Sequence, residues 1–113
     1  MGVVRVKDGV QFTKIAPAGF RILAVVTSVA DKLTHDLRIT SACDGPHSGP
    51  NDPHHRGEAY DVGSKELGEE EKPLILQSFQ DRLEADHFYC FLESPDTDNE
   101  HFHLQIKKGT TYP

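Results

Sequence analysis

The segment HFHLQIK at residues 101–107 restricts the fold of this chain more than any other, because its side chains alternate strictly in character. Its apolar set is Phe102, Leu104 and Ile106, and its polar set is His101, His103 and Gln105. Successive side chains of a β-strand point to opposite faces, so this pattern predicts a strand with one buried face and one polar face. The chain must therefore build a sheet that is covered on one side only.

Two helices are predicted to provide that cover. Apolar residues recur at intervals of three and four between residues 20 and 34, which indicates a helix with one buried stripe. That stripe consists of Phe20, Leu23, Val26, Ala30 and Leu33. The preceding APAG at residues 16–19 is expected to break the pattern before the helix begins. The second helix is expected over about residues 70–86, with an acidic first turn and with Leu76, Phe79 and Leu83 buried.

The remaining elements are strands that complete the sheet. Three are expected at residues 37–42, 58–62 and 87–94, and the first fourteen residues can hold another short one. A polar loop separates 87–94 from 101–107, which favours an antiparallel pair. The length of 113 residues suits a single domain, residues 1–113. The predicted fold class is α+β, a small and mainly antiparallel sheet with helices packed on one face and a metal site on the other.

The metal site is predicted from polar residues that the strands and one loop bring together. Asp61 lies on the polar face of the strand at 58–62, and a Pro- and Gly-rich loop at residues 44–54 leads to His54. Gly57 allows a sharp turn between loop and strand. His54, Asp61 and His103 then supply two imidazoles and one carboxylate, which suit a catalytic Zn²⁺ site with an open fourth position. The alternative is that no metal binds and the histidines are incidental.

Two residues beside the metal ligands are candidates for catalysis. A carboxylate is needed to accept the proton of the attacking water, and Glu100, three residues before His103, is the first candidate. Strict alternation places Glu100 on the side of Phe102, so this role requires a bulge or a strand that begins at His101 or later. His101 is the next candidate for the base.

These residues also fall into two motifs of a known peptidase family. His54, Gly57, Ala59 and Asp61 match H-x-x-G-x-A-x-D, and Glu100 with His103 matches E-x-x-H. From about residue 20 to residue 107 the chain resembles the zinc D-Ala-D-Ala carboxypeptidases and L-alanyl-D-glutamate endopeptidases. The resemblance implies that the matching His, Asp and second His bind zinc and that Glu100 is the base. It also implies hydrolysis of a peptide bond in the stem peptides of bacterial peptidoglycan.

The chain departs from this family at two places. Members often carry Ser two residues before the first zinc histidine, where this chain has Asp52. They often carry Arg shortly after the strand that corresponds to LRITSA, where this chain has Cys43 and Asp44. Such an arginine can hold a substrate carboxylate or a developing oxyanion, and Arg38 or Arg56 is a candidate replacement. Its loss also leaves open a non-catalytic zinc-binding domain, either structural or wall-peptide-binding, for example of a phage particle.

Composition excludes other classes of partner. The chain has 12 Lys and Arg against 18 Asp and Glu, a formal net charge of −6, and no basic cluster, so nucleic acid is not an expected partner. The most apolar stretch, residues 20–30, is too short to span a membrane, and no signal peptide is recognisable. We expect a monomer made in the cytoplasm that acts on a peptidoglycan peptide at the cell wall. Cys43 and Cys90 are expected to be reduced and buried.

Overall fold

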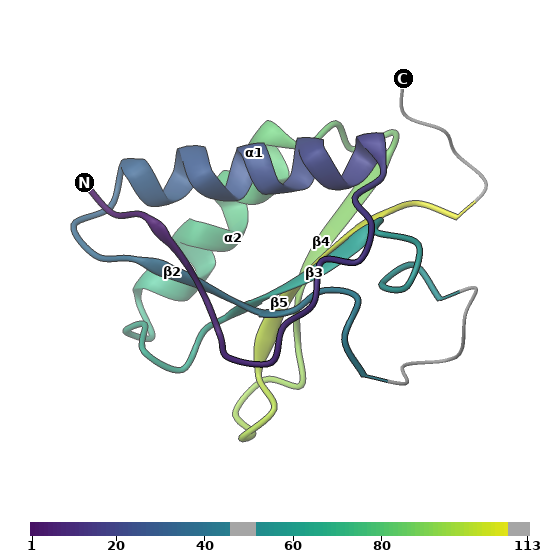
Figure 1. Ribbon diagram of the computed structural model, residues 1–113. Coiled ribbons are helices and arrows are strands. Elements are labelled where there is room, and N and C mark those ends of the chain that lie inside the picture. Colours follow the sequence, from purple (N-terminus) through teal and green to yellow (C-terminus); the bar gives the residue numbers. More distant parts are fainter. Residues whose placement is uncertain (46–51, 109–113) are drawn as a thin grey trace.

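Five strands form one mixed sheet, and two helices cover one of its faces (Figure 1). The computed structural model describes residues 1–45 and 52–108. In chain order the elements are β1 (Val4–Val6), α1 (Pro17–Asp31), β2 (Leu37–Ser41), β3 (Ala59–Gly63), α2 (Glu71–Arg82), β4 (Phe88–Glu93) and β5 (His101–Ile106). The strand order is β1-β2-β3-β5-β4, with β1 parallel to β2 and the other neighbours antiparallel. The predicted α+β class with a mainly antiparallel sheet is confirmed.

Helix α1 begins three residues earlier than predicted. Pro17 is at its first turn, where the fixed backbone angle of proline suits a helix and its missing N–H needs no partner. The expectation that residues 16–19 break the helical pattern is therefore wrong for 17–19. The predicted stripe is confirmed for Val26 and Ala30, which are fully buried, and is wrong for Phe20, which is 63% exposed. The buried residues of α1 are Ala18, Gly19, Ile22, Val25, Val26, Val29 and Ala30.

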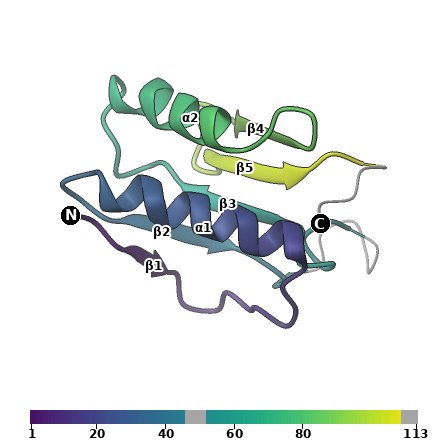
Figure 2. The same ribbon diagram turned by 90° about the horizontal axis from the view of Figure 1, so that it is seen from above.

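Helix α2 packs against β4 and β5. Phe79 is fully buried, and its ring meets that of Phe102 in β5 edge to face, with 5.5 Å between the ring centroids. The helix ends at Arg82, four residues before the predicted end, and Leu83 already has an extended backbone. Leu83 is nevertheless buried, so its side chain belongs to the core although its backbone has left the helix. Figure 2 shows α1 above β2 and β3, and α2 on the side of β4.

The strands keep the predicted alternation. Tyr60 and Val62 of β3 lie in the core together with Phe102 and Leu104 of β5, each fully buried. The intervening residues Asp61, His101 and His103 therefore point to the face opposite the helices. In the β3·β5 register Asp61 pairs with His103, and Gly63 pairs with His101. This register places a carboxylate beside an imidazole in the middle of the sheet.

Two glycines allow α1 to dock against the turn that precedes β3. Gly57 has a φ of +73°, and a Cβ there would lie 2.4 Å from the carbonyl oxygen of Lys14. The predicted sharp turn at Gly57 is thus confirmed. A Cβ on Gly19 would lie 2.1 Å from the carbonyl oxygen of Gly57. That oxygen accepts hydrogen bonds from the Ala16 N–H and the Tyr60 hydroxyl, each at 3.2 Å.

Three further expectations concern features outside this packing. Cys43 and Cys90 are both buried and unpaired with each other, as expected for reduced thiols. Within the described ranges, no helix is long and apolar enough to cross a membrane. The loop expected at 44–54 includes residues 46–51, which lie outside the described residues.

Gly19→Ala should lower stability although alanine is the better helix former. The substitution would ordinarily stabilise a helix interior by about 1 kcal/mol. Here the methyl group meets the Gly57 backbone, and overpacking of this kind costs ~1–3 kcal/mol. Urea unfolding measures the change. Phe20→Ala, on the exposed side of the same turn, is the control and should stay within about 0.5 kcal/mol of wild type. A higher stability for Gly19→Ala would contradict the described docking.

Candidate metal centre

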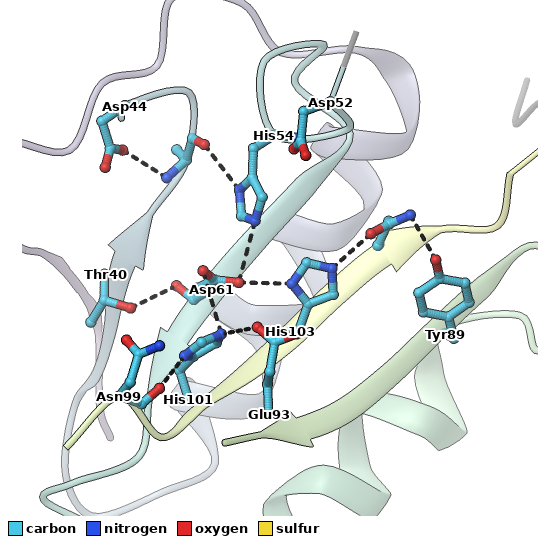
Figure 3. A network of polar contacts seen from close by, with 12 residues as sticks. Thr40, Asp44, Asp52, His54, Asp61, Tyr89, Glu93, Asn99, His101 and His103 are labelled. Atoms are coloured by element: carbon cyan, nitrogen blue, oxygen red, sulfur yellow. Dashed lines mark hydrogen bonds and ion pairs between the residues drawn. The ribbon is translucent and has the colours of Figure 1, made fainter. Parts of the chain in front are cut away.

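Three buried side chains from separate segments converge on the face opposite the helices (Figure 3). They are His54 from the turn before β3, Asp61 from β3 and His103 from β5. Asp61 Oδ1 lies 2.9 Å from His103 Nδ1 and 3.5 Å from His54 Nε2. One ligand atom from each of the three residues lies within 4.8 Å of the others. The structure thus brings together the three residues that the sequence suggested as ligands.

A backbone carbonyl group orients the His54 imidazole toward Asp61. His54 Nδ1 lies 3.0 Å from the carbonyl oxygen of Ala42, which can only accept, so Nδ1 carries the hydrogen and Nε2 faces Asp61. The Asp52 carboxylate accepts a hydrogen bond from the backbone N–H of His54 at 2.9 Å. This residue, which stands where the resembling family often has Ser, helps to hold the His54 backbone in place.

A second pair of side chains orients His103. Its Nε2 lies 2.7 Å from Gln105 Oε1, and Gln105 Nε2 donates to the Tyr89 hydroxyl at 2.7 Å. In this orientation the amide oxygen faces His103, which places a hydrogen on Nε2 and leaves Nδ1 facing Asp61. The Phe91 ring packs beside the His103 ring, 5.2 Å between centroids. Strand β4 therefore holds the imidazole in place from the side.

The three residues perturb one another strongly. Burial by itself raises the pKa of Asp61, but hydrogen bonds to His103 and His54 outweigh it and hold that pKa well below its ordinary value. Burial lowers the pKa of His103, but its hydrogen bonds to Asp61 and Gln105 prevail, so the pKa is raised above 6.5. In the metal-free protein the carboxylate is thus ionised, and it stabilises a proton on His103.

The arrangement fits a divalent metal ion. With bonds of 2.0–2.1 Å, two ligand atoms of a tetrahedral site lie about 3.3 Å apart. The separations of 2.9 and 3.5 Å around Asp61 Oδ1 are close to this edge length. Two imidazoles and one carboxylate suit Zn²⁺ and also non-haem Fe(II), so the ligand set alone does not select the ion.

His101 lies beside the three ligands. Its Nδ1 lies 2.6 Å from the Asn99 carbonyl oxygen, so this nitrogen carries a hydrogen. Its Nε2 lies 2.7 Å from Glu93 Oε1 and 3.6 Å from Asp61 Oδ2 (Figure 3). His101 therefore lies next to the candidate ligand Asp61.

Glu100 occupies a different environment from the one expected. Its carboxylate is ion-paired with Lys72 of α2 at 2.7 Å and accepts hydrogen bonds from the Ser64 hydroxyl and the Asp96 N–H at 2.7 and 2.8 Å. The ion pair with Lys72 thus directs the Glu100 carboxylate toward α2, although β5 begins at His101. Lys72 first, then Asp96 and Ser64, lower the pKa of Glu100 to about 2. The structure thus engages Glu100 with Lys72, Ser64 and the Asp96 N–H, and its role as the base stays a prediction.

The two candidate arginines are now placed. Arg38 lines a cavity of about 240 Å³ together with Thr40, Gly63 and His101. Its ion pair with Glu66 is long, at 3.7 Å, and the Glu66 side chain is 82% exposed. Arg56 is instead ion-paired with Glu58 at 2.7 Å. Arg38 is thus the arginine that shares a cavity with a residue of the site.

Three residues of the site did not emerge from the sequence: Glu93, Gln105 and Tyr89. Glu93 is the last residue of β4 and pairs with His101, the first residue of β5. Their pairing could have been predicted from their positions at the two ends of the polar loop, since residues that flank a hairpin loop face each other. Gln105 was visible on the polar side of its strand, but its partner across the sheet depends on the register.

Comparisons with known proteins leave the site to be judged on its geometry. No family model, no curated protein and no solved structure significantly matches the chain. The relationship to the peptidase family that the two sequence motifs suggest is therefore a proposal.

Gln105→Leu should weaken metal binding by roughly 10–100-fold, because the residue that directs the metal-facing nitrogen of His103 is lost. Tyr89→Phe, which keeps the ring and removes the hydroxyl, should show a smaller loss in the same direction. Competition with a chromophoric chelator measures both. Gln80→Leu is the matched control, since Gln80 also hydrogen-bonds to β4, through the Cys90 carbonyl. Equal affinities for all three variants would contradict the orienting role.

Metal affinity should decrease as the pH is lowered. A metal on His103 Nδ1 takes the place of the proton shared with Asp61, so binding releases a proton below the pKa of His103. That pKa is raised, so affinity is full above it and decreases by about tenfold per pH unit below it, starting at a higher pH than for an ordinary imidazole. Chelator competition between about pH 8.5 and 5.5 measures this dependence. A flat profile would contradict the protonated state of His103.

Proposed function

We propose that this chain is a zinc-dependent peptidase that hydrolyses a peptide bond in bacterial peptidoglycan stem peptides, as a carboxypeptidase or an L-Ala-D-Glu type endopeptidase. The observation that carries this proposal is the convergence of His54, Asp61 and His103, with both imidazoles directed at one carboxylate oxygen. Three ligands leave a fourth position for substrate, as in catalytic rather than structural zinc sites.

The chain's own residues would hold the metal and handle the proton. Zinc bound there would polarise the scissile carbonyl group and lower the pKa of a coordinated water. His54, Asp61 and His103 would fix its position, with Ala42 and Gln105 maintaining the direction of the two rings. The low pKa of Asp61 means that this ligand is already ionised at neutral pH.

His101 is the proposed general base. Its Nδ1–H is engaged by the Asn99 carbonyl group, so Nε2 is the nitrogen that can accept the water proton, once the hydrogen that it donates to Glu93 in the metal-free protein has been released. Glu93, 2.7 Å from that nitrogen, would stabilise the imidazolium that forms. His101 would then return the proton to the nitrogen of the leaving amine. Imidazole is the side chain that most often serves in this way at neutral pH.

Glu100 is proposed to position His101 rather than to accept the proton. A carboxyl with a pKa of about 2 is a weak base, and its oxygens are already engaged by Lys72, Ser64 and the Asp96 N–H. These contacts anchor the end of the loop that precedes His101. On this proposal, the Glu of the E-x-x-H motif anchors the loop before His101 and does not transfer a proton.

Arg38 is the proposed anchor for a substrate carboxylate. Stem peptides carry several carboxylates, and a guanidinium binds such a group in a charge-assisted and often bidentate manner. The cavity that Arg38 shares with His101 connects this anchor with the base. Action on the cell wall requires the protein to reach it, as a lysis enzyme released by other means or as part of a larger particle such as a phage.

One observation favours a second, non-hydrolytic function. His101 Nε2 is near enough to Asp61 for His101 to become a fourth ligand, which would saturate the metal. The chain would then be a structural or wall-peptide-binding domain that uses zinc to hold its loop.

The deciding experiment compares two variants on purified peptidoglycan and short stem peptides, with release of new amino groups as the readout. His101→Gln should retain zinc and lose about 10²–10⁴-fold in rate, the typical contribution of a general base. Glu100→Gln should retain zinc and most of the rate at a temperature where it is folded, with a lower unfolding midpoint because Lys72 loses one of its two carboxylate partners.

The outcomes separate the alternatives. If Glu100→Gln is folded and zinc-loaded yet as inactive as His101→Gln, Glu100 also takes part in proton transfer and the positioning role is wrong. If wild-type protein loaded with one equivalent of zinc cleaves no wall peptide, the peptidase proposal fails and the non-hydrolytic function replaces it.

A further inference from the structure

A second group of potential ligands borders the first. Glu93, His101 and His103 each offer a ligand atom, and these atoms lie within 4.8 Å of one another. Glu93 and His101 are not among the three residues of the first site. His101 Nε2 lies 2.7 Å from Glu93 Oε1, and this contact joins β5 to β4. An imidazole and a carboxylate so placed form half of a cation site.

Asp61 can complete this second site without leaving the first. His103 directs Nδ1 at Asp61 Oδ1, so one nitrogen cannot serve two ions at once. Asp61 has another oxygen, Oδ2, which lies 3.6 Å from His101 Nε2. This separation nearly equals the 3.5 Å between Asp61 Oδ1 and His54 Nε2 in the first site. The two oxygens of one carboxylate thus face two different sets of ligands.

We propose that a second divalent cation of the zinc type binds between His101 Nε2, the Glu93 carboxylate and Asp61 Oδ2, with Asp61 bridging it to the first ion. Two-metal sites place their ions about 3.5–4 Å apart, a spacing that a carboxylate bridges with one oxygen on each ion. The Glu93 side chain is 44% exposed, so it can move to open its contact with His101 around an ion. The same exposure makes the second site the weaker of the two.

The second cation inhibits the proposed peptidase. This consequence rests on the proposed function, in which His101 Nε2 accepts the water proton. The lone pair of that nitrogen cannot bind a cation and accept a proton at the same time. Activity therefore rises as the first site fills and declines as the second site fills.

Metal stoichiometry tests the site independently of activity. Metal-free protein is titrated with Zn²⁺ alone by calorimetry at neutral pH. Wild type should bind two ions per chain, the second at least about tenfold more weakly, since Glu93 must give up its contact with His101. Glu93→Gln should bind one ion with the first affinity retained. Glu71→Gln is the matched control, because Glu71 forms a similar pair with His35, at 2.7 Å, away from the site, and should leave two ions bound.

Titration with Co²⁺ alone tests the bridge. Two Co²⁺ ions joined by Asp61 couple magnetically, so the paramagnetic resonance signal per ion should fall as the second equivalent binds. In Glu93→Gln the signal should rise to one equivalent and then stay constant. An undiminished signal at two equivalents in wild type would show two separate sites and overturn the bridging geometry.

The outcomes also separate this site from the proposed function. A wild-type stoichiometry of one ion at saturation, or two ions retained in Glu93→Gln, overturns the second site whatever the activity. Binding of two ions, with no hydrolysis of wall peptides even when one equivalent of zinc is bound, leaves the second site in place and refutes the peptidase. Hydrolysis that does not decline while the second ion binds refutes the inhibitory consequence and assigns the base to a residue other than His101.

Discussion

The pairing of Asp61 with His103 across β3 and β5 is the contact on which the site depends. A carboxylate buried in the middle of a sheet is costly unless charged or hydrogen-bonding partners surround it, and loss of one partner of a buried pair typically costs ~3–5 kcal/mol. His103 and His54 meet this requirement in the metal-free protein. A divalent cation would meet it equally well, so the same electrostatic demand that shapes the folded state also prepares a metal site.

The fold delivers these partners through backbone contacts far from the open face. Gly57 provides the positive φ that turns the chain from His54 into β3, and Gly19 allows α1 to approach that turn. The Ala42 carbonyl, just after β2, then directs the His54 ring. Helix, turn and sheet are therefore coupled to one imidazole, although no residue of α1 contributes a ligand.

Lys72 gives Glu100 a different environment from that of Glu93, the other glutamate near His101. It reaches from α2 to Glu100, forms an ion pair with that carboxylate and lowers its pKa. Glu93, on the neighbouring strand, remains beside His101. Two glutamates close to the same histidine thus have different environments, one joined to a helix and the other half exposed over the candidate site.

The α+β class, the one-sided strands and the three candidate ligands could be predicted from the amino-acid sequence, because alternation with period two is a local property that needs no knowledge of distant residues. The sequence also contained both catalytic candidates, but not the choice between them. Only the tertiary structure decided that Glu100 pairs with Lys72, that Glu93 meets His101, and that Gln105 and Tyr89 orient His103. It also replaced Phe20, which is exposed, by Ile22 in the buried stripe of α1, whereas Val26 and Ala30 are buried as predicted. The physical reason is that strand register and the partner of a buried charge arise from segments far apart in the chain, on which local periodicity carries no information.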